Sequence, residues 1–279
     1  MPFSLILQGY PASDVPAAHV QGPILQAMFL TLLRQVDPEL TNRLHANSAY
    51  RPYTLSPLGL MAQNRDFQGW RMPRDRMIAA ETACFVRITF LEDDLFATFS
   101  SYFLSRIDPT FRLGETQFTA TDVLVGADSR QRWGRFVSHQ ALAERASDTE
   151  RRIHLRFLTP TSFRAGNWDL PLPLPRLVFR SYQKRFEEFA HITVPPEFAD
   201  SVEEHVGVSR LDRLSTDIIK TKKVMLIGFT GDVVFQIDSK APSEFVRYVN
   251  LLADYAFFCG TGRKTAVGMG QTKRIYDRR

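Results

Sequence analysis

Apolar residues recur along this chain with two different spacings, which predict its first elements. The run Phe3–Tyr10 has the length and composition of a strand. After Pro23, apolar side chains recur every three or four residues as far as Val36, which is the spacing of one helical face. Pro38 begins a second, shorter helix that ends near His45. The chain therefore opens with a strand followed by two helices.

The remainder of the first half is predicted to be extended around one further helix. An extended segment covers Arg51–Leu60, and Cys84–Phe90 alternates as a strand does. A helix is predicted near Asp93–Ile107, followed by paired extended segments between Phe111 and Val125. The first half therefore reads strand, helix, strand, strand, helix, strand.

The second half repeats this order. Its predicted elements are a strand at 153–157, a helix near Leu177–Ala190, two long extended segments at Val206–Lys220 and Val224–Asp238, a helix over Ser243–Phe258 and a last strand near Gln271–Tyr276. Two βαββαβ halves predict an α+β protein with two tandem ferredoxin-like domains, each with helices on one face of a four-stranded antiparallel sheet. The polar stretch 127–152 separates them, and we place the boundary near its end, between domains 1–148 and 149–279.

The distribution of charge favours a polyanionic partner more than the net charge does. A formal charge of +5 is ordinary for 279 residues. The C-terminal segment 263–279, however, carries six basic residues against the single Asp277. A second basic cluster consists of Arg210, Arg213, Lys220, Lys222 and Lys223. Such clusters are typical of surfaces that meet phosphate.

Cysteine usage and hydropathy place the protein in a reducing, aqueous compartment. Cys84 and Cys259 lie in apolar surroundings without metal-ligand spacing. No apolar run approaches the ~20 residues that span a bilayer. No basic residue precedes the short apolar stretch of Met1–Tyr10, so it is not expected to be a signal peptide. We therefore expect a cytoplasmic protein without membrane association, metal or other cofactor.

One glycine-rich segment stands out after the last predicted helix. Residues 259–271 read CGTGRKTAVGMGQ, with Gly260, Gly262, Gly268 and Gly270 on either side of Arg263 and Lys264. Glycines allow a backbone to approach a ligand closely, and the two cations are suited to phosphate. We predict that these six residues contact a phosphate-bearing ligand.

Two nucleotide-binding motifs do not fit this segment. A nucleoside-triphosphate loop follows a strand and joins its glycine directly to lysine, whereas here Arg263 intervenes and a helix precedes. The dinucleotide fingerprint needs a third glycine where Thr265 stands, and then a full strand–helix–strand unit. A glycine-rich turn without a ligand explains one or two of the glycines but not the whole pattern.

With its preceding helix, this segment resembles the C-terminal signature of CRISPR repeat-processing endoribonucleases of the RAMP superfamily. Three further segments are similar to that family: FLTPTSFR at 157–164, LPLPLP at 170–175 with LVF at 177–179, and GFTGDV at 228–233. The resemblance implies two tandem ferredoxin-like domains and cleavage of repeat RNA. It also implies metal-independent chemistry in which the 2′-hydroxyl of the RNA attacks the adjacent phosphate.

The resemblance also points to catalytic residues in the first half. His45 stands after the first helix pair, where many members of the family carry a catalytic histidine, and imidazole can transfer protons near neutral pH. The helix before it lacks the tyrosine that some members have. Tyr50 or Tyr53 is a substitute hydroxyl, and Arg51 is the following cation. Arg51 stays protonated and can only stabilise charge. His45 can equally be an ordinary residue at a helix end.

The expected partner is CRISPR repeat RNA, and other subunits of a CRISPR effector complex or a second copy of the chain are further partners to test. The basic turn Lys220–Lys223 is a solvated hairpin tip or, in this family layout, an RNA contact. His154 is assigned to the polar face of its strand, and Trp70, Trp133 and Trp168 to cores or domain seams rather than base stacking.

The alternative function is a non-catalytic RAMP subunit. An unrelated ferredoxin-like RNA binder ranks last, because the aromatic RNP signature is absent.

Overall fold

The computed structural model describes the chain except for residues 46–49, 65–76, 106–108, 127–132, 221–224 and 277–279. It divides into two compact units. The first comprises 1–136 with 219–225 and 266–268, and the second comprises 137–218, 226–265 and 269–279. The domain boundary that we place near residue 148 stays a prediction. Each unit is described by itself below.

The first unit builds one main sheet from strands that are distant in sequence. Its elements in chain order are β1 (Phe3–Pro11), β2 (Val15–Pro16), η1 (Ala17–Val20), α1 (Pro23–Arg34), α2 (Pro38–His45), β3 (Tyr53–Leu55), β4 (Gly59–Leu60), η2 (Met61–Gln63), β5 (Met77–Ile78), β6 (Cys84–Phe90), α3 (Asp93–Leu104), β7 (Thr110–Leu113), β8 (Thr116–Leu124) and β9 (Arg135–Phe136). The sheet has the order β3-β6-β1-β8-β7, and its pairs are antiparallel. The central strand β1 lies between β6 and β8, which is the ferredoxin-like order.

Aromatic side chains join the helices of the first unit to its sheet. The ring of Phe90 on β6 lies 6.0 Å from that of Phe29 on α1 and 5.3 Å from that of Phe99 on α3. All three are almost completely buried. Helix α1 begins at Pro23, whose ring fixes φ where no backbone donor is needed. The apolar faces predicted from sequence therefore form the core of this unit.

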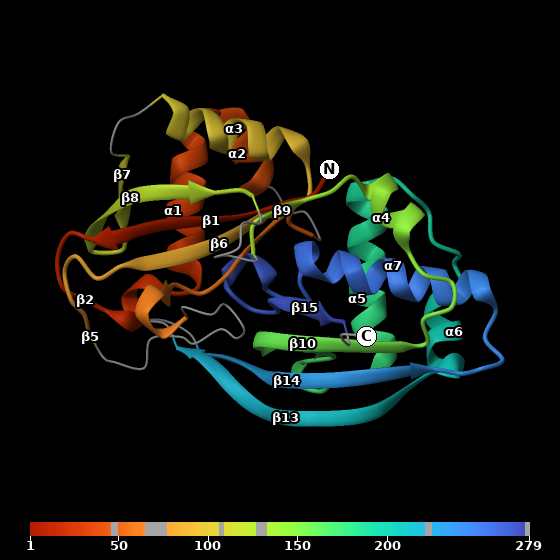
Figure 1. Ribbon diagram of the computed structural model, residues 1–279. Coiled ribbons are helices and arrows are strands. Elements are labelled where there is room, and N and C mark those ends of the chain that lie inside the picture. The colour runs from red at the N-terminus through yellow and green to blue at the C-terminus, as the bar shows by residue number, and fades with distance from the viewer. Residues whose placement is uncertain (46–49, 65–76, 106–108, 127–132, 221–224, 277–279) are drawn as a thin grey trace. The chain divides into compact units, whose positions relative to one another are not determined.

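The second unit has the same order with longer strands. Its elements are α4 (His139–Arg145), β10 (Arg152–Thr161), β11 (Phe163–Ala165), β12 (Trp168–Leu170), α5 (Pro175–Ala190), α6 (Phe198–His205), β13 (Val206–Lys220), β14 (Met225–Ile237), α7 (Ser243–Cys259), η3 (Thr265–Val267) and β15 (Thr272–Ile275). The sheet order is β13-β14-β10-β15. Figure 1 shows α5 and α7 on one side of β10 and β14. Both units are thus ferredoxin-like, which confirms the predicted fold.

The face of this sheet under α5 and α7 is apolar. The ring of Phe179 on α5 lies 5.5 Å from that of Phe235 on β14, and Phe186 on α5 lies 5.1 Å from Tyr255 on α7. On β10, Ile153 and Leu155 are buried on this face, so the alternating residues His154 and Arg156 belong to the opposite face. The predicted place of His154 on the polar face is confirmed.

One prediction from sequence needs correction, and the structure adds elements that the sequence patterns did not locate. Trp168 is not a core residue, because it lies beside the turn of the β11–β12 hairpin and is 80% exposed, whereas Trp133 is buried as predicted. The polar stretch between the two halves contains a helix, α4, and a further helix, α6, precedes β13. The predicted extended segment Arg51–Leu60 contains two short strands, β3 and β4. Trp70 lies outside the described residues.

Candidate functional site

The glycine-rich segment begins where α7 ends and turns repeatedly through left-handed backbone conformations. The positive φ angles are 65° at Gly260, 71° at Gly262, 56° at Lys264, 102° at Gly268 and 71° at Gly270. Glycine adopts such angles without strain, whereas an L-residue such as Lys264 does so at a cost. The spacing of the glycines therefore follows from the shape of the segment.

Neighbouring backbone leaves no room for side chains at two of these glycines. A Cβ at Gly262 would stand 2.3 Å from the carbonyl oxygen of Ser162, and one at Gly270 would stand 2.0 Å from that of Thr261. Both are buried. The structure thus gives these glycines a packing role inside the protein, and their contact with RNA stays a prediction.

The backbone amides of the segment are largely committed to the protein. The amide of Thr261 donates to Gly270 O at 2.8 Å, that of Arg263 to Ser162 O at 3.0 Å, and that of Gly270 to Pro160 O at 3.0 Å. These hydrogen bonds tie the segment to itself and to β10. The phosphate contact predicted for this segment would therefore come from its side chains more than from these amides.

A buried polar network fixes the segment between α5 and β15. The Thr261 hydroxyl lies 2.6 Å from the Tyr182 hydroxyl on α5 and 2.7 Å from that of Thr272 on β15. Arg185, also on α5, donates to the carbonyl oxygen of Gly262. Burial raises the pKa of Tyr182 far above its ordinary value, so its hydroxyl stays protonated and acts as a hydrogen-bonding group.

Cations gather where this framework reaches the surface of the second unit. Arg263 and Arg164 both bond the carboxylate of Asp169, the latter at 3.4 Å. Desolvation lowers the pKa of Lys264, and the charges of Arg263 and Arg164 lower it further. The pKa of Arg263 is lowered by desolvation and by Arg164. Two arginines share one carboxylate, and Lys264 lies near enough to both for their charges to act on it, so the cluster keeps a positive local field, which suits a phosphate.

Arg164 and Asp169 were not assigned a role from sequence. Both stand on the short hairpin of β11 and β12, where they are direct cross-strand partners. The hairpin turns at Gly166, which has a φ of 57°. A glycine with positive φ at the first position of a two-residue turn is typical of hairpins, and this is the sequence signal that was available.

Part of the basic hairpin turn lies outside the described residues. Lys220 ends β13 and its side chain is exposed. Lys222 and Lys223 fall in the segment 221–224, of which nothing is described. The RNA contact predicted for the turn stays a prediction.

The predicted catalytic residues lie close together in the sequence of the first unit. His45 is the last residue of α2, and its side chain lies outside what the structure describes. The Arg51 guanidinium donates to the carbonyl oxygen of Leu44, the residue before His45. Tyr50 is half-buried. Arg51 is therefore held at the helix end that carries His45, where a cation also meets the negative end of the helix dipole.

Tyr53 is a core residue and does not suit the substitute-hydroxyl role. It is fully buried on β3, and its hydroxyl accepts a hydrogen bond from Gln26 Nε2 at 3.0 Å. Burial is the largest influence on its pKa, which is raised above the ordinary value. Of the two tyrosines weighed from sequence, Tyr50 is the one with an accessible surface.

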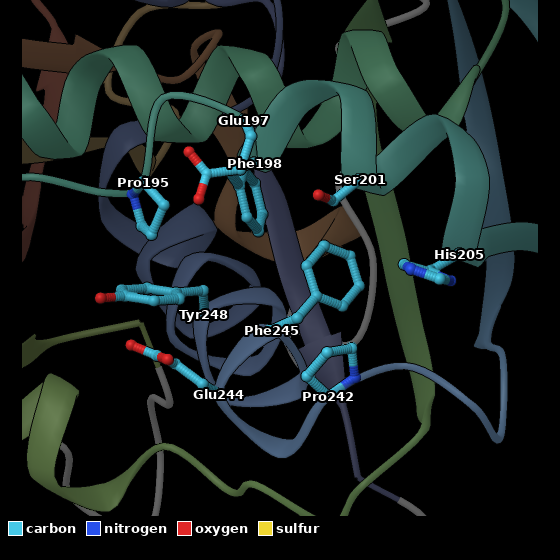
Figure 2. Close-up of a pocket in the computed structure, with 9 residues that line it drawn as sticks. All are labelled: Pro195, Glu197, Phe198, Ser201, His205, Pro242, Glu244, Phe245 and Tyr248. Carbon is cyan, nitrogen blue, oxygen red and sulfur yellow. The ribbon is translucent and has the colours of Figure 1, made fainter.

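A pocket of about 190 Å³ in the second unit does not have the chemistry of an RNA site (Figure 2). It lies between α6 and α7, with Phe198 and Phe245 at its centre and Glu197 and Glu244 at one side. Carboxylates repel phosphate, and the volume is below the ~300 Å³ of small-molecule sites.

Within the described residues, no group of three His, Cys, Asp or Glu side chains is placed to hold a metal ion. No helix there is long and apolar enough to cross a membrane.

Comparison with known proteins gives a family match along nearly the whole chain. A model described as the CRISPR Cas6 N-terminal domain matches residues 1–144, and one described as CRISPR-associated endoribonuclease Cas6 matches residues 155–272. The CRISPR-associated endoribonuclease Cas6 of Streptococcus thermophilus is 25% identical over 119 residues, which cover 42% of this chain and 48% of the relative. The aligned segment thus spans about half of that curated relative.

Solved structures of the same kind match both units. A Thermus thermophilus Cas6 in a product complex superimposes with a TM-score of 0.82 at 25% identity, covering 99% of this chain and 100% of the other. A second Cas6 product complex gives a TM-score of 0.75, also at 25% identity, with 99% and 100% covered.

Proposed function

The chain belongs to the CRISPR-associated Cas6 family, and from that premise we propose that it binds CRISPR repeat RNA and cleaves it into guide RNAs. The observation that carries this proposal is the cation cluster of Arg164, Arg263 and Lys264 on the framework of the glycine-rich segment. Guanidinium and ammonium groups held in a fixed arrangement bind the RNA backbone irrespective of base sequence.

Cleavage is proposed to occur at the end of α2, without a metal ion. The 2′-oxygen of the RNA attacks the adjacent phosphorus, the bond to the 5′-oxygen breaks, and the products are a 2′,3′-cyclic phosphate and a 5′-hydroxyl. One proton leaves the 2′-hydroxyl and one is delivered to the 5′-oxygen. His45 is suited to one of these transfers and Tyr50 to hydrogen bonding at the reacting oxygens. Arg51 stabilises the charge of the phosphorane.

The nucleophile of this reaction belongs to the substrate, so two manipulations test it directly. Purified protein incubated with repeat RNA in EDTA should yield the cyclic-phosphate product. A single 2′-deoxy substitution upstream of the scissile phosphate should abolish cleavage and leave binding intact. Loss of activity in EDTA, or cleavage of the deoxy substrate, contradicts the mechanism.

The role of His45 is tested by separating rate from affinity. His45→Ala should lower the single-turnover rate on the order of 10²-fold or more, because a proton transfer is lost. RNA affinity should change little, since neutral imidazole contributes little to phosphate binding. His19→Ala removes a histidine of the same unit outside the proposed site and serves as the control. An unchanged rate for His45→Ala at saturating protein would remove His45 from the mechanism and favour the non-catalytic alternative.

A further inference from the structure

A second charged cluster lies on the face of the β13-β14-β10-β15 sheet opposite α5 and α7. The antiparallel register places Arg156 on β10 directly across from Asp232 on β14. Arg156 Nε donates to Asp232 Oδ1 at 2.6 Å, and His154 Nε2 lies 3.2 Å from the same oxygen. The Asp232 side chain is only 6% exposed. A buried carboxylate with these partners is a fixed point on this face.

Arg213 on β13 also contacts the other oxygen of this carboxylate, but only at the limit of hydrogen-bonding distance. Its guanidinium nitrogen stands 3.5 Å from Asp232 Oδ2, and the side chain is 77% exposed. An ion pair with this geometry and exposure contributes little to stability. Most of the donor capacity of the Arg213 guanidinium therefore faces solvent.

The backbone at Arg213 is strained. Its φ is 52°, in the left-handed region that favours glycine. The facing residue is Gly231, with a φ of 131°, where a Cβ would stand 2.7 Å from the carbonyl oxygen of Arg213. Strand β13 thus approaches β14 closely at this point, as strands do at a bulge. The geometry requires glycine at 231 and would be relieved by glycine at 213.

Neither packing nor the ion pair offsets this strain, so the arginine needs another reason to stand there. Strained backbone persists at positions where a side chain must be held for a ligand. We propose that Arg213 binds a phosphodiester of RNA on this sheet face, beside the Arg156–Asp232–His154 cluster. The proposal rests on repeat RNA being the partner.

The neighbouring charges and the geometry of guanidinium support this assignment. A planar guanidinium binds a phosphate through two parallel hydrogen bonds. Arg210, on the same strand, is 60% exposed, but it is paired with Asp212 at 2.9 Å and has ordinary backbone geometry. Arg213 is therefore the better placed of the two for phosphate, and Arg210 is its matched control.

The test uses Arg213→Gly in the full chain, with a repeat RNA made uncleavable by a 2′-deoxy substitution. RNA affinity should fall about tenfold, as expected for one charge-assisted contact. The slope of log affinity against log salt should decrease by about 0.7, the value for one phosphate of a single strand. The melting temperature should rise by roughly 1–3 °C, because glycine relieves the strain. Opposite changes in stability and affinity identify a residue kept for its ligand.

Two controls separate the site from general effects. Arg210→Ala removes a charge from the same strand and should change affinity much less. His191→Gly relieves a positive φ of 54° at the end of α5 and should leave affinity unchanged. Arg213→Gln removes the charge with little change in length, and it repeats the affinity test if the glycine variant is less stable than expected.

The outcomes distinguish this proposal from the proposed function. If the Arg213 variants keep the affinity and the salt slope of the wild-type protein, the phosphate site is overturned. If the wild-type protein still cleaves the native RNA in that case, the nuclease function is unaffected. An equal loss in Arg210→Ala also overturns the site, since net charge alone then explains the effect. If the native RNA stays uncut while Arg213→Gly still weakens binding, the nuclease function fails and the site stands.

Discussion

Lys264 is a cation of the glycine-rich segment whose surroundings disfavour its charged form. Burial is the main influence that lowers its pKa, and Arg263 and Arg164 add like charge. Its backbone is also left-handed, with a φ of 56°. A lysine with a lowered pKa loses its charge at a lower pH than an exposed lysine does. Lys264 is therefore the cation in this cluster whose phosphate binding is most sensitive to rising pH.

Lys264→Arg should make RNA binding less dependent on pH. As the pH rises from neutral towards the ordinary pKa of lysine, the wild-type affinity should fall as Lys264 deprotonates, whereas the guanidinium of the variant stays charged. The measurement is the Kd for the 2′-deoxy repeat RNA across this range. Lys240→Arg, at an exposed position outside the segment, is the control. Parallel pH profiles for wild type and Lys264→Arg would show that Lys264 does not bind the RNA.

Glycine-to-alanine substitutions should separate steric clash from backbone strain. Gly270→Ala should suffer both effects, because its φ is 71° and its Cβ would collide with Thr261 O. We expect its free energy of unfolding to fall by about 3 kcal/mol or more. Gly166→Ala meets strain alone, with no atom within 4 Å, and should cost about 1 kcal/mol. Gly207→Ala has neither and should be within about 0.5 kcal/mol of wild type. Urea unfolding measures all three, and equal losses would contradict this account.

At the scale of elements, the buried Thr261 hydroxyl links α5, the glycine-rich segment and β15. Thr261→Val keeps the shape but removes the group that the Tyr182 and Thr272 hydroxyls share. We expect the free energy of unfolding to fall by about 2 kcal/mol, since buried hydroxyls lose a partner. Ser101→Ala, an exposed hydroxyl on α3, is the control. Thr261→Val with wild-type stability would show that the network does not anchor the segment.

Elements with a long apolar face were predictable, and several short ones without such a face were not. Helices α1, α5 and α7 each bury several residues at helical spacing, so periodicity located them within a few residues. Helix α6 buries only Phe198 and Val202, and α4 buries none of its residues, so neither gives a periodic signal. Strands β11 and β12 have three residues each, too few to show alternation.

The site was predictable as far as it is local in sequence. Glycine spacing drew attention to the segment 259–271, and the closeness of Arg51 to the helix end at His45 followed from their order in the chain. The partners that strand pairing brings together could not be predicted from the sequence. Asp169 meets Arg263 only through the β11–β12 hairpin, and Asp232 meets Arg156 only through the register of β10 with β14. Such contacts depend on tertiary structure that no local pattern encodes.

At the scale of the whole molecule, the positive charge should appear as a steep salt dependence of RNA binding. Apart from Arg51 at the proposed cleavage site, the described cations proposed to bind phosphates of the RNA are Arg164, Lys220, Arg263, Lys264 and, by the further inference, Arg213. Each contact with a single strand contributes about 0.7 to the slope of log affinity against log salt, so five contacts give roughly 3.5. Affinity for the 2′-deoxy repeat RNA should then fall about a hundredfold between 50 and 200 mM salt.

The same titration identifies which cations carry this dependence. The double variant Arg263→Ala/Lys264→Ala removes two proposed contacts, so its slope should be smaller than that of wild type by about 1.4. The double variant Arg145→Ala/Arg247→Ala removes the same charge from α4 and α7, away from the glycine-rich segment, and should keep the wild-type slope. A flat wild-type titration would mean that phosphate contacts do not dominate binding. Equal slopes for the two double variants would mean that total charge, and not the cluster at the glycine-rich segment, attracts the RNA.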